Sequence, residues 1–270
     1  MLNMLKNLHF WRVWLPPHVM AAVGWYYLGF NWRALAVFFV CYTLISGLGV
    51  AVGLHRFFSH KAFKTSRFWE QMMLYCGMLA CHGNPLFWVA LHRGLHHRYS
   101  DTEKDPHSPV AHSIWHSYQG YAFDPTLVQQ VPIRAGADFL RHPEWQWSVE
   151  RYHTTLWVTW WLAFTVSAIF GAWWILVGLV TAQVWAIHQE AMVNVLGHVD
   201  GFGAYRNYET DDHSVNRNWL GLITWGQALH NNHHACAADG NFAQGYKFYK
   251  RFEFDPCILW INAISHKETK

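Results

Sequence analysis

The chain has 270 residues, of which 52% are hydrophobic, 18% aromatic and only 14% charged. A water-soluble domain carries about 25% charged residues, so this composition argues against a protein whose whole surface faces water. The net charge is +3 and the basic residues are scattered, which argues against a nucleic-acid-binding protein. The mean hydropathy of −0.01 is too low for a chain that lies wholly in a membrane. We therefore expect a membrane part and a water-facing part.

Four apolar stretches are suited to crossing a bilayer as helices, which takes about 20 residues each. The first two cover residues 14–30 and 34–54, and the tight link Asn31-Trp-Arg33 joins them. The second two cover residues 155–170 and 172–187, with an uncharged link near Gly171. The sequence thus predicts an all-α integral membrane protein with two short helical hairpins. We interpret residues 1–270 as one domain, in which 55–154 and 188–270 form a helical cap.

Residues 71–91 are also apolar, but Gly83, Asn84 and Pro85 interrupt them. Glycine and proline punctuate regular structure, so we predict a buried or interfacial helix with a break rather than a fifth span.

The basic residues predict the orientation in the membrane. Only Arg33 lies in a hairpin link, whereas the other charges next to the spans lie on the cap side. These are Lys61, Lys64, Arg67, Arg134, Arg141, Arg151, Arg206, Arg217, Lys247, Lys250 and Arg251. Cytoplasmic loops carry the excess of lysine and arginine, so we expect both termini and the cap in the cytoplasm. No small-residue cleavage site follows the first apolar run, which we therefore expect to stay in the membrane.

Nine of the twenty histidines lie in four short motifs, which we call the histidine boxes. The boxes are His55-Arg-Phe-Phe-Ser-His60, His92-Arg-Gly-Leu-His96-His97, Gly197-His198 and His230-Asn-Asn-His233-His234. Neutral imidazole is a common ligand of iron, zinc and copper, and one such ion takes roughly three or four of them. Nine imidazoles therefore predict two metal ions.

The spacing inside the second box predicts which rings share a helix face. His92 and His96 are four residues apart, so on an α-helix they lie on one face. His97 then points about 100° away and is free to reach a second ion.

The spacing in the other boxes leads to similar expectations. His230, His233 and His234 lie within one helical turn, so we expect all three to aim at one place. His55 and His60 are five residues apart and converge only if the helix bends or ends between them.

Four further polar side chains lie near the boxes. Asp101 and Asp105 follow the second box closely and are suited to orienting box histidines by accepting their second N–H. We single out His107 from the other eleven histidines because it ends the motif Asp105-Pro-His107. Asn194 lies four residues before His198 at the end of the last span. The boxes contain no Glu-x-x-His pair of a soluble di-iron bundle and no His-Glu-x-x-His protease motif.

Together these motifs resemble the membrane-bound fatty acyl desaturase family and are most similar to its Δ9 acyl-CoA and acyl-lipid members. The likeness runs from about Ser46 to Asp255. The motifs that carry it are Gly53-Leu-His-Arg-Phe-Phe-Ser-His60, His96-His-Arg-Tyr-Ser-Asp101, Asp105-Pro-His107, Asn194-x-x-x-His198, Tyr205-Arg-Asn-Tyr208 and His230-Asn-Asn-His-His234.

The resemblance implies four transmembrane helices beneath a cytosolic cap that holds two iron ions. It implies that the nine box histidines are the iron ligands and that Asn194 contacts one iron through water. It also implies an O2-dependent removal of two hydrogens from an acyl chain carried by CoA, a carrier protein or a phospholipid. Electrons would come from a donor such as ferredoxin or a b-type cytochrome.

Two other outcomes remain open on the same scaffold, an acyl hydroxylase and a triple-bond-forming acetylenase. The alternative from another class is a non-catalytic metal transporter or sensor. A transporter would need ionisable residues inside its spans, and residues 34–54 and 155–170 have none.

The resemblance also assigns the acyl tunnel and reveals departures from the family pattern. Tyr42 and Thr43 are the residues that we expect to close the tunnel, and Trp88 and Trp185 are expected to line it. Three residues separate His92 from His96, where the Δ9 acyl-CoA enzymes usually have two. Gln227 stands before the last box, where a glutamate is usual.

Overall fold

The computed structural model describes residue 4, residues 7–243 and residues 253–266. These residues contain no β-strand and only isolated bridges, such as the one between Thr65 and Ser265. The predicted all-α fold class is therefore confirmed. Lys247, Lys250 and Arg251, which entered the prediction of orientation, lie outside the described residues.

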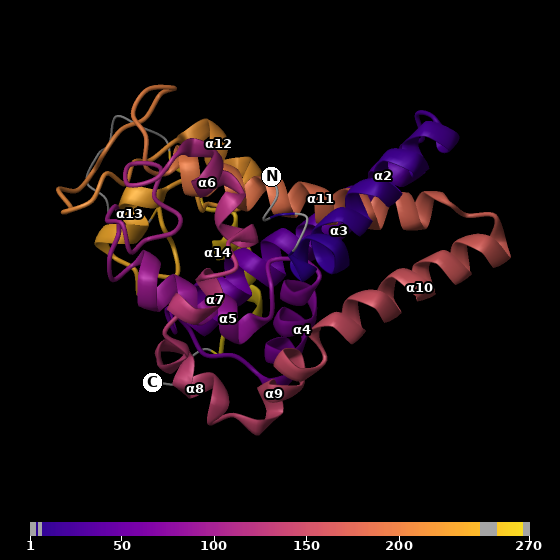
Figure 1. Ribbon diagram of the computed structural model, residues 1–270, viewed down its shortest axis with the longest axis horizontal. Helices are drawn as coiled ribbons and strands as arrows, with labels where there is room; N and C mark the ends of the chain where they lie inside the picture. Colours follow the sequence, from indigo (N-terminus) through magenta and orange to yellow (C-terminus); the bar gives the residue numbers. More distant parts are fainter. Residues whose placement is uncertain (1–3, 5–6, 244–252, 267–270) are drawn as a thin grey trace.

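Two helical hairpins project from one side of the molecule (Figure 1). The first consists of α2 (Leu15–Leu28) and α3 (Trp32–Tyr42), and α3 continues directly into the π-helix η2 (Thr43–Ser59). The second consists of α10 (Tyr152–Phe170) and α11 (Trp174–Leu196). The Asn31 side chain caps α3 by accepting two backbone N–H bonds, and Gly171 ends α10 at φ 62°. These two local signals explain why both links are short.

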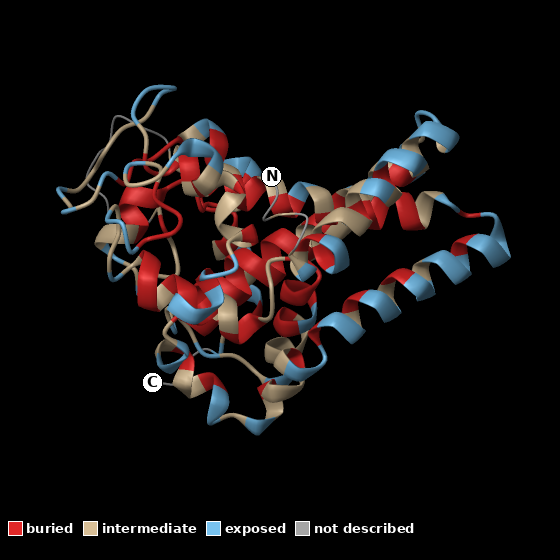
Figure 2. Cartoon of the chain, viewed as in Figure 1, coloured by how far each residue is buried: buried red, intermediate tan, exposed pale blue. Residues whose placement is uncertain are grey.

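The hairpins carry apolar side chains on their outer faces. Among the described residues only the continuous helix Trp32–Ser59 is both long and apolar enough to cross a membrane. α10 nevertheless exposes Trp161, Leu162 and Phe170, and most of its outer face is exposed in Figure 2. Contiguous exposed apolar surface marks contact with lipid or with another protein.

Glycines allow the helices to approach closely beneath the cap. A Cβ atom on Gly49 of η2 would lie 2.5 Å from backbone atoms of Cys76 and Gly77 in α4 (Arg67–Met78). A Cβ atom on Gly178 of α11 would lie 2.6 Å from Val37 in α3. Close helix contact through small residues fixes where η2 and α11 end in the cap.

The cap is built from short helices. The predicted break is present, since α4 ends at Met78 and α5 (Pro85–Leu91) begins after the six intervening residues 79–84. Gly83 lies there at φ 89°, and the Asn84 side chain caps α5. The other described elements are η1 (Phe10–Trp14), η3 (His92–His96), α6 (Ile114–Tyr118), η4 (Gly120–Phe123), α7 (Leu127–Gln130), η5 (Ile133–Gly136), α8 (Ala137–Leu140), α9 (Pro143–Glu150), α12 (Asn218–Ile223), α13 (His230–Ala235) and α14 (Cys257–Ile264).

A buried ion pair joins η2 to the C-terminal part of the cap. Arg56 Nη2 lies 2.7 Å from Asp255 Oδ2, and both side chains are 0% exposed. Arg56 also donates to the backbone carbonyls of Ala51 and Gly240, so the buried guanidinium is well bonded. This pair holds the end of η2, and with it the first histidine box, against the segment before α14.

Candidate metal centre

All nine box histidines meet in the cap, at the inner ends of η2 and α11. Their ring nitrogens form two groups, and within each group these atoms lie within 4.8 Å of one another. The five-histidine group contains His55, His60, His92, His97 and His233. The four-histidine group contains His96, His198, His230 and His234.

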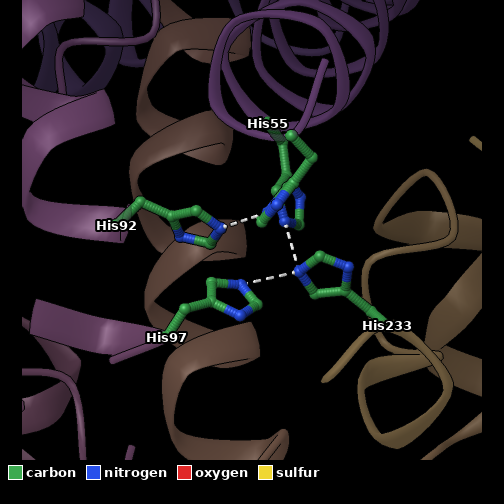
Figure 3. Close-up of side chains that lie close together, drawn as sticks. His55, His92, His97 and His233 are labelled. Atoms are coloured by element: carbon green, nitrogen blue, oxygen red, sulfur yellow. Dashed lines mark hydrogen bonds between the residues drawn. The ribbon is translucent and has the colours of Figure 1, made fainter. Parts of the chain in front are cut away.

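The rings face one another through their Nε2 atoms. In the five-histidine group, His233 Nε2 lies 2.8 Å from His55 Nε2 and 2.9 Å from His97 Nε2 (Figure 3). A neutral ring nitrogen carries either one hydrogen or one lone pair, so His233 Nε2 cannot make a hydrogen bond of matched sense at every such contact. Lone pairs that converge on a shared cation fit this arrangement.

The four-histidine group has the same character. His230 Nε2 lies 3.0 Å from His198 Nε2, and His234 Nε2 lies 3.2 Å from His96 Nε2. The donor set of both groups is therefore imidazole nitrogen, which suits iron, zinc, copper and nickel among the biological metals.

The π-helical geometry of η2 and η3 explains how the rings are paired. A backbone bond of 3.2 Å joins the N–H of His60 to the carbonyl of His55, and one of 2.9 Å joins His97 to His92. These i to i+5 bonds define π-helix, in which residues five apart stack one turn above the other. The structure therefore pairs His92 with His97. Our expectation that His92 and His96 share a face was wrong because it assumed α-helical spacing.

The last box serves both groups rather than one. His230 and His234, four residues apart on α13, lie in the four-histidine group, whereas His233 points into the five-histidine group. The expectation that all three rings aim at one place was therefore wrong. The short helix α13 lies between the groups, so neighbouring rings diverge to opposite sides.

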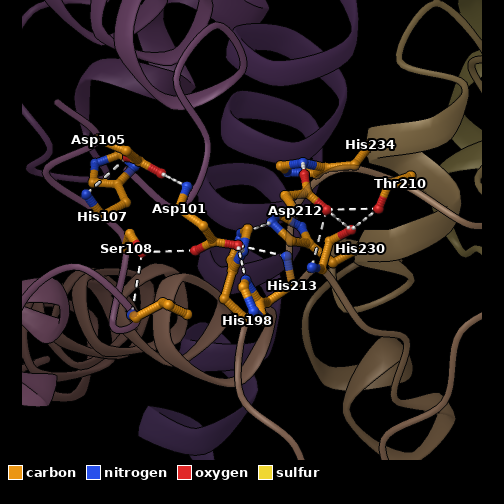
Figure 4. Close-up of polar contacts among 12 residues, drawn as sticks. Asp101, Asp105, His107, Ser108, His198, Thr210, Asp212, His213, His230 and His234 are labelled. Carbon is orange, nitrogen blue, oxygen red and sulfur yellow. Dashed lines mark hydrogen bonds and ion pairs between the residues drawn. The ribbon is translucent and has the colours of Figure 1, made fainter. Parts of the chain in front are cut away.

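Carboxylates hold three rings of the four-histidine group, those of His96, His198 and His234. Asp105 Oδ2 accepts from His96 Nδ1 at 3.0 Å. Asp101 Oδ2 accepts from His198 Nδ1 at 2.9 Å (Figure 4). Both contacts have the geometry that the sequence suggests. A proton held on Nδ1 leaves the Nε2 lone pair free for a metal.

The third carboxylate was missed by the sequence analysis. Asp212 Oδ2 accepts from His234 Nδ1 at 2.5 Å, and its Oδ1 accepts from Ser214 and Thr210. The available signal was the acidic pair Asp211-Asp212 in the polar loop ahead of the last box. Asp212 does not lie three or four residues from any box histidine, so its position in the sequence did not predict a contact with one.

Burial keeps most of these rings neutral. Burial, with Arg93 nearby, lowers the pKa of His60 to about 3. Burial lowers the pKa of His234 to about 4, although the bond to Asp212 opposes that shift. His96 is the exception, because Asp105 and other carboxylates outweigh burial and raise its pKa. Neutral imidazole is the form that binds metal, so the centre is prepared for cations near pH 7.

A cavity of about 30 Å³ lies beside the two groups. Box histidines of both groups line it, together with Trp88, Asn194 and Gln227. Its volume corresponds to about one water molecule, so it has room for a small ligand. Asn194 thus lines the same cavity as histidines of both groups.

His107 and Gln227 lie at the wall of the same cavity. The buried His107 ring packs 5.3 Å from the His96 ring and 4.6 Å from Tyr121. Neither ring nitrogen of His107 has a hydrogen-bond partner among the described residues. Gln227 Oε1 accepts from His55 Nδ1 at 3.0 Å, so the residue that departs from the family pattern still contacts a box histidine.

A second cavity of about 520 Å³ opens between η1, η4 and the starts of α5 and α10. His82 and Tyr121 line both cavities. The larger cavity therefore adjoins the small one across these two side chains. Sequence analysis named neither residue, because they lie outside the boxes and far apart in the chain.

The four tunnel candidates differ in their surroundings. Trp88 lines the small cavity and stacks on the His92 ring at 4.9 Å. The Tyr42 hydroxyl donates to Gln189 Oε1 at 2.6 Å, and its ring lies 6.5 Å from Trp185. The Thr43 hydroxyl donates to the Phe39 carbonyl of its own helix. Tyr42, Thr43 and Trp185 line neither cavity.

Comparison with known proteins gives a consistent result. The family model described as fatty acid desaturase matches residues 30–242. The palmitoyl-monogalactosyldiacylglycerol delta-7 desaturase of Arabidopsis thaliana is 36% identical over 76% of this chain and 54% of its own, so the chain spans about half of its length. The sn-1 stearoyl-lipid 9-desaturase of Anabaena variabilis is 32% identical over 87% of this chain and 82% of its own. Delta-9 acyl-lipid desaturase 2 of Arabidopsis thaliana is 34% identical over 86% of this chain and 72% of its own.

Proposed function

The chain belongs to the fatty acid desaturase family and is an oxidoreductase that introduces a double bond into fatty acyl chains, and we propose that it does so with two iron ions and O2. One iron would bind in the five-histidine group and the other in the four-histidine group. The observation that supports this most is the convergence of nine Nε2-facing rings into two groups, with rings of both groups lining one small cavity. Asn194 would contact one of the two irons through a water molecule.

The protein and the metal divide the work. When bound, the iron pair supplies with O2 the oxidising power to break an unactivated C–H bond, chemistry that side chains cannot provide. The protein holds the rings: Asp101, Asp105 and Asp212 keep the proton on Nδ1 of their histidines. The small cavity, closed by Trp88 and by buried rings, excludes bulk water from the reacting methylene groups.

The acyl chain would approach through the larger cavity. Its 520 Å³ suit a polar head and the first part of a chain, and His82 and Tyr121 form the boundary to the small cavity. The far end of the chain would pass Trp88 and end near Tyr42, Thr43 and Trp185, where α3, η2 and α11 pack. Electrons would come from an external donor such as ferredoxin or a b-type cytochrome.

We further propose that the two hairpins form four membrane spans with the cap and both termini in the cytoplasm. The outward apolar side chains of α10 and the apolar tip of the first hairpin, including Tyr26 and Phe30, support this arrangement. The scarcity of basic residues in the links agrees with the positive-inside rule. Lipid would contact the faces of the two hairpins that are exposed in Figure 2.

A lipid-linked acyl chain is the substrate that we propose first. The names of three similar proteins describe lipid-linked acyl chains, whereas an Anemone leveillei relative, 29% identical over 85% of this chain, is named an acyl-CoA 5-desaturase. A membrane-embedded enzyme with an open cavity above its spans can take such a substrate directly from the bilayer.

The deciding experiment is product analysis by mass spectrometry. Membranes with the protein, O2 and a reduced electron donor receive acyl chains linked to glycerolipid, CoA or carrier protein. A product that has lost two hydrogens and carries a cis double bond supports the proposal. A product that has gained an oxygen atom identifies a hydroxylase, and a triple bond identifies an acetylenase. A purified protein with one exchangeable zinc ion and no O2 consumption would contradict the proposal.

A further inference from the structure

His55 differs from the other bonded rings of the centre in what its Nδ1 atom contacts. His96, His198 and His234 each bond a carboxylate directly. His55 Nδ1 instead lies 3.0 Å from the amide oxygen of Gln227. The amide nitrogen of Gln227 in turn lies 2.5 Å from Glu190 Oε1. A carboxylate is therefore present at this ring too, but one side chain further away.

The chemistry of the donors and acceptors fixes the direction of this chain of bonds. An ionised Glu190 only accepts, so the Gln227 amide then turns its NH2 group towards Glu190 and its oxygen towards His55. His55 must then donate from Nδ1. Its Nε2 lone pair is left free, and Nε2 is the atom that lies 2.8 Å from His233 Nε2. Glu190 thereby selects the ring form that a metal needs.

Glu190 is a buried carboxyl group beside the two histidine groups. The residue is 7% exposed, and Gln227 is 2% exposed. Glu190 makes no ion pair among the described residues, and its second amide donor is Gln189 at 3.0 Å. Burial raises the pKa of Glu190 to about 7, although the hydrogen bonds from Gln227 and Gln189 oppose that shift. A buried carboxylate with amide partners alone is therefore costly to maintain. Glu190 also lines the small cavity, one helical turn before Asn194, so cations bound in the two groups would offset that cost.

We propose that Glu190 is a positioning residue that acts on His55 through Gln227 and carries the negative charge that Gln227 lacks. The inference rests on the proposed di-iron function. The resemblance predicts a glutamate at position 227, and this chain has that charge on α11 instead. A single carboxylate can serve from either position, because the two side chains are already hydrogen-bonded to each other.

This arrangement permits a test by exchanging the two residues. Glu190→Gln keeps the hydrogen bonds and removes the charge, and the double variant Glu190→Gln with Gln227→Glu moves the charge to position 227. Loss of a carboxylate that orients a metal-bound histidine typically weakens metal binding about 10- to 100-fold. We expect that loss in the single variant, measured by chelator competition, and near wild-type affinity in the double variant. Glu150→Gln, at the exposed end of α9, is the matched control.

Mössbauer spectra of the iron-loaded proteins separate a local effect from general damage. Since His55 lies in the five-histidine group, only one of the two iron signals should shift in Glu190→Gln, and the shift should reverse in the double variant. Unchanged affinity and spectra in Glu190→Gln would overturn the inference, because a neutral glutamic acid would behave like glutamine. The inference would also be overturned by a double variant that binds metal as weakly as the single variant. If the single variant fails to fold, a double variant with metal affinity well below that of the wild type overturns the inference in the same way. A wild-type protein that binds no iron pair would instead refute the proposed function.

Discussion

At the scale of single residues, three loop carboxylates hold rings of the candidate metal centre by accepting from Nδ1 of His96, His198 and His234. Asp101 illustrates how much local structure serves one bond: it adopts φ 60° and accepts from His198, from Ser108 and from the backbone N–H of His213. Aspartate tolerates this left-handed conformation better than most residues. Burial raises the pKa of such a carboxyl, but these bonds, led by the one from His198, lower it below its usual range. Asp101 therefore remains an acceptor.

The first prediction concerns Asp212. Asp212→Asn keeps the size of the side chain but removes the charge that faces His234 Nδ1 at 2.5 Å. We expect a loss of metal affinity of about 10- to 100-fold, the range for residues that orient metal-bound histidines. Metal content after dialysis against a chelator measures the effect.

The neighbouring Asp211 provides the control for this variant. Asp211 is exposed, so Asp211→Asn should retain its metal. Equal metal loss in both variants would indicate a general effect of loop charge and would contradict a specific role for Asp212.

Residue-scale prediction from sequence succeeded where chemistry and spacing coincide. The two carboxylates that closely follow the second box could be found, because the loop from His97 to Asp105 is short. Asp212 and Glu190 could not, since their partners His234 and Gln227 lie 22 and 37 positions away. Only the folded chain brings them together.

At the scale of secondary-structure elements, the π-helical geometry of η2 and η3 decides which rings share a group. Both pairs, His55 with His60 and His92 with His97, are five residues apart and joined by i to i+5 bonds. An apolar pattern cannot reveal this geometry, because the pattern of η2 is apolar on nearly every side. The convergence of the nine box histidines could thus be predicted from sequence, whereas their division into two groups could not. The extra residue between His92 and His96, which departs from the family pattern, is accommodated by η3.

The second prediction concerns the contact that positions η2. A Cβ atom on Gly49 would lie 2.5 Å from the backbone of α4, where no flexible side chain can move aside. Gly49→Ala should push η2 away from α4 and destabilise the fold by about 1–3 kcal/mol, as overpacking does. We expect a lower thermal unfolding midpoint in detergent, together with reduced metal binding because His55 and His60 move with η2.

Gly221 on α12 offers a matched substitution. A Cβ atom there would meet only Leu229, at 4.0 Å, and alanine favours helix by up to about 1 kcal/mol over glycine. Gly221→Ala should therefore keep or raise the midpoint. A Gly49→Ala protein as stable as this control would show that the two helices can separate without cost.

At the scale of the whole molecule, the two cavities connect segments that are far apart in sequence. The larger cavity is lined from η1, from the loop before α5, from η4 and from the start of α10. Composition and hydropathy predicted the hairpins and the cap, because the helices of the hairpins leave a continuous apolar signal. They could not predict the cavity, since no single stretch of sequence contains it.

The third prediction tests the larger cavity as the path of the acyl chain. Ala122 on η4 lines this cavity, and Ala122→Trp would fill part of it while leaving the boxes untouched. We expect lower desaturation with unchanged metal content, and a larger loss for chains with bulky head groups. Leu140→Trp, at an exposed residue that lines neither cavity, should behave like wild type. Full activity of Ala122→Trp on every substrate would place the entry path elsewhere.

The last prediction is that the metal-free protein loses stability in mild acid. Burial lowers the pKa of His60 and His107 to about 3 and that of His234 to about 4, whereas unfolded histidine titrates near about 6.5. Between these values the unfolded chain binds protons that the folded chain does not bind. The free energy of unfolding must therefore fall as pH falls from about 6.5 towards 3, by up to about 2 kcal/mol per ring at pH 5.

The other titrating groups do not reverse this sign. His96 and Glu190 have raised pKa values and contribute the opposite trend, but these are two groups against the three rings with lowered pKa. Burial raises the pKa of Asp105, but its interactions with His96 outweigh burial and lower that pKa to about 2. Asp105 therefore adds a loss of stability in the same direction, below about pH 4.

Unfolding midpoints in detergent at pH 7 and pH 5 measure the trend. His107→Gln should make the dependence shallower, whereas the same change at the half-exposed His142 should not, and a midpoint that rises towards pH 5 would contradict the burial of neutral rings.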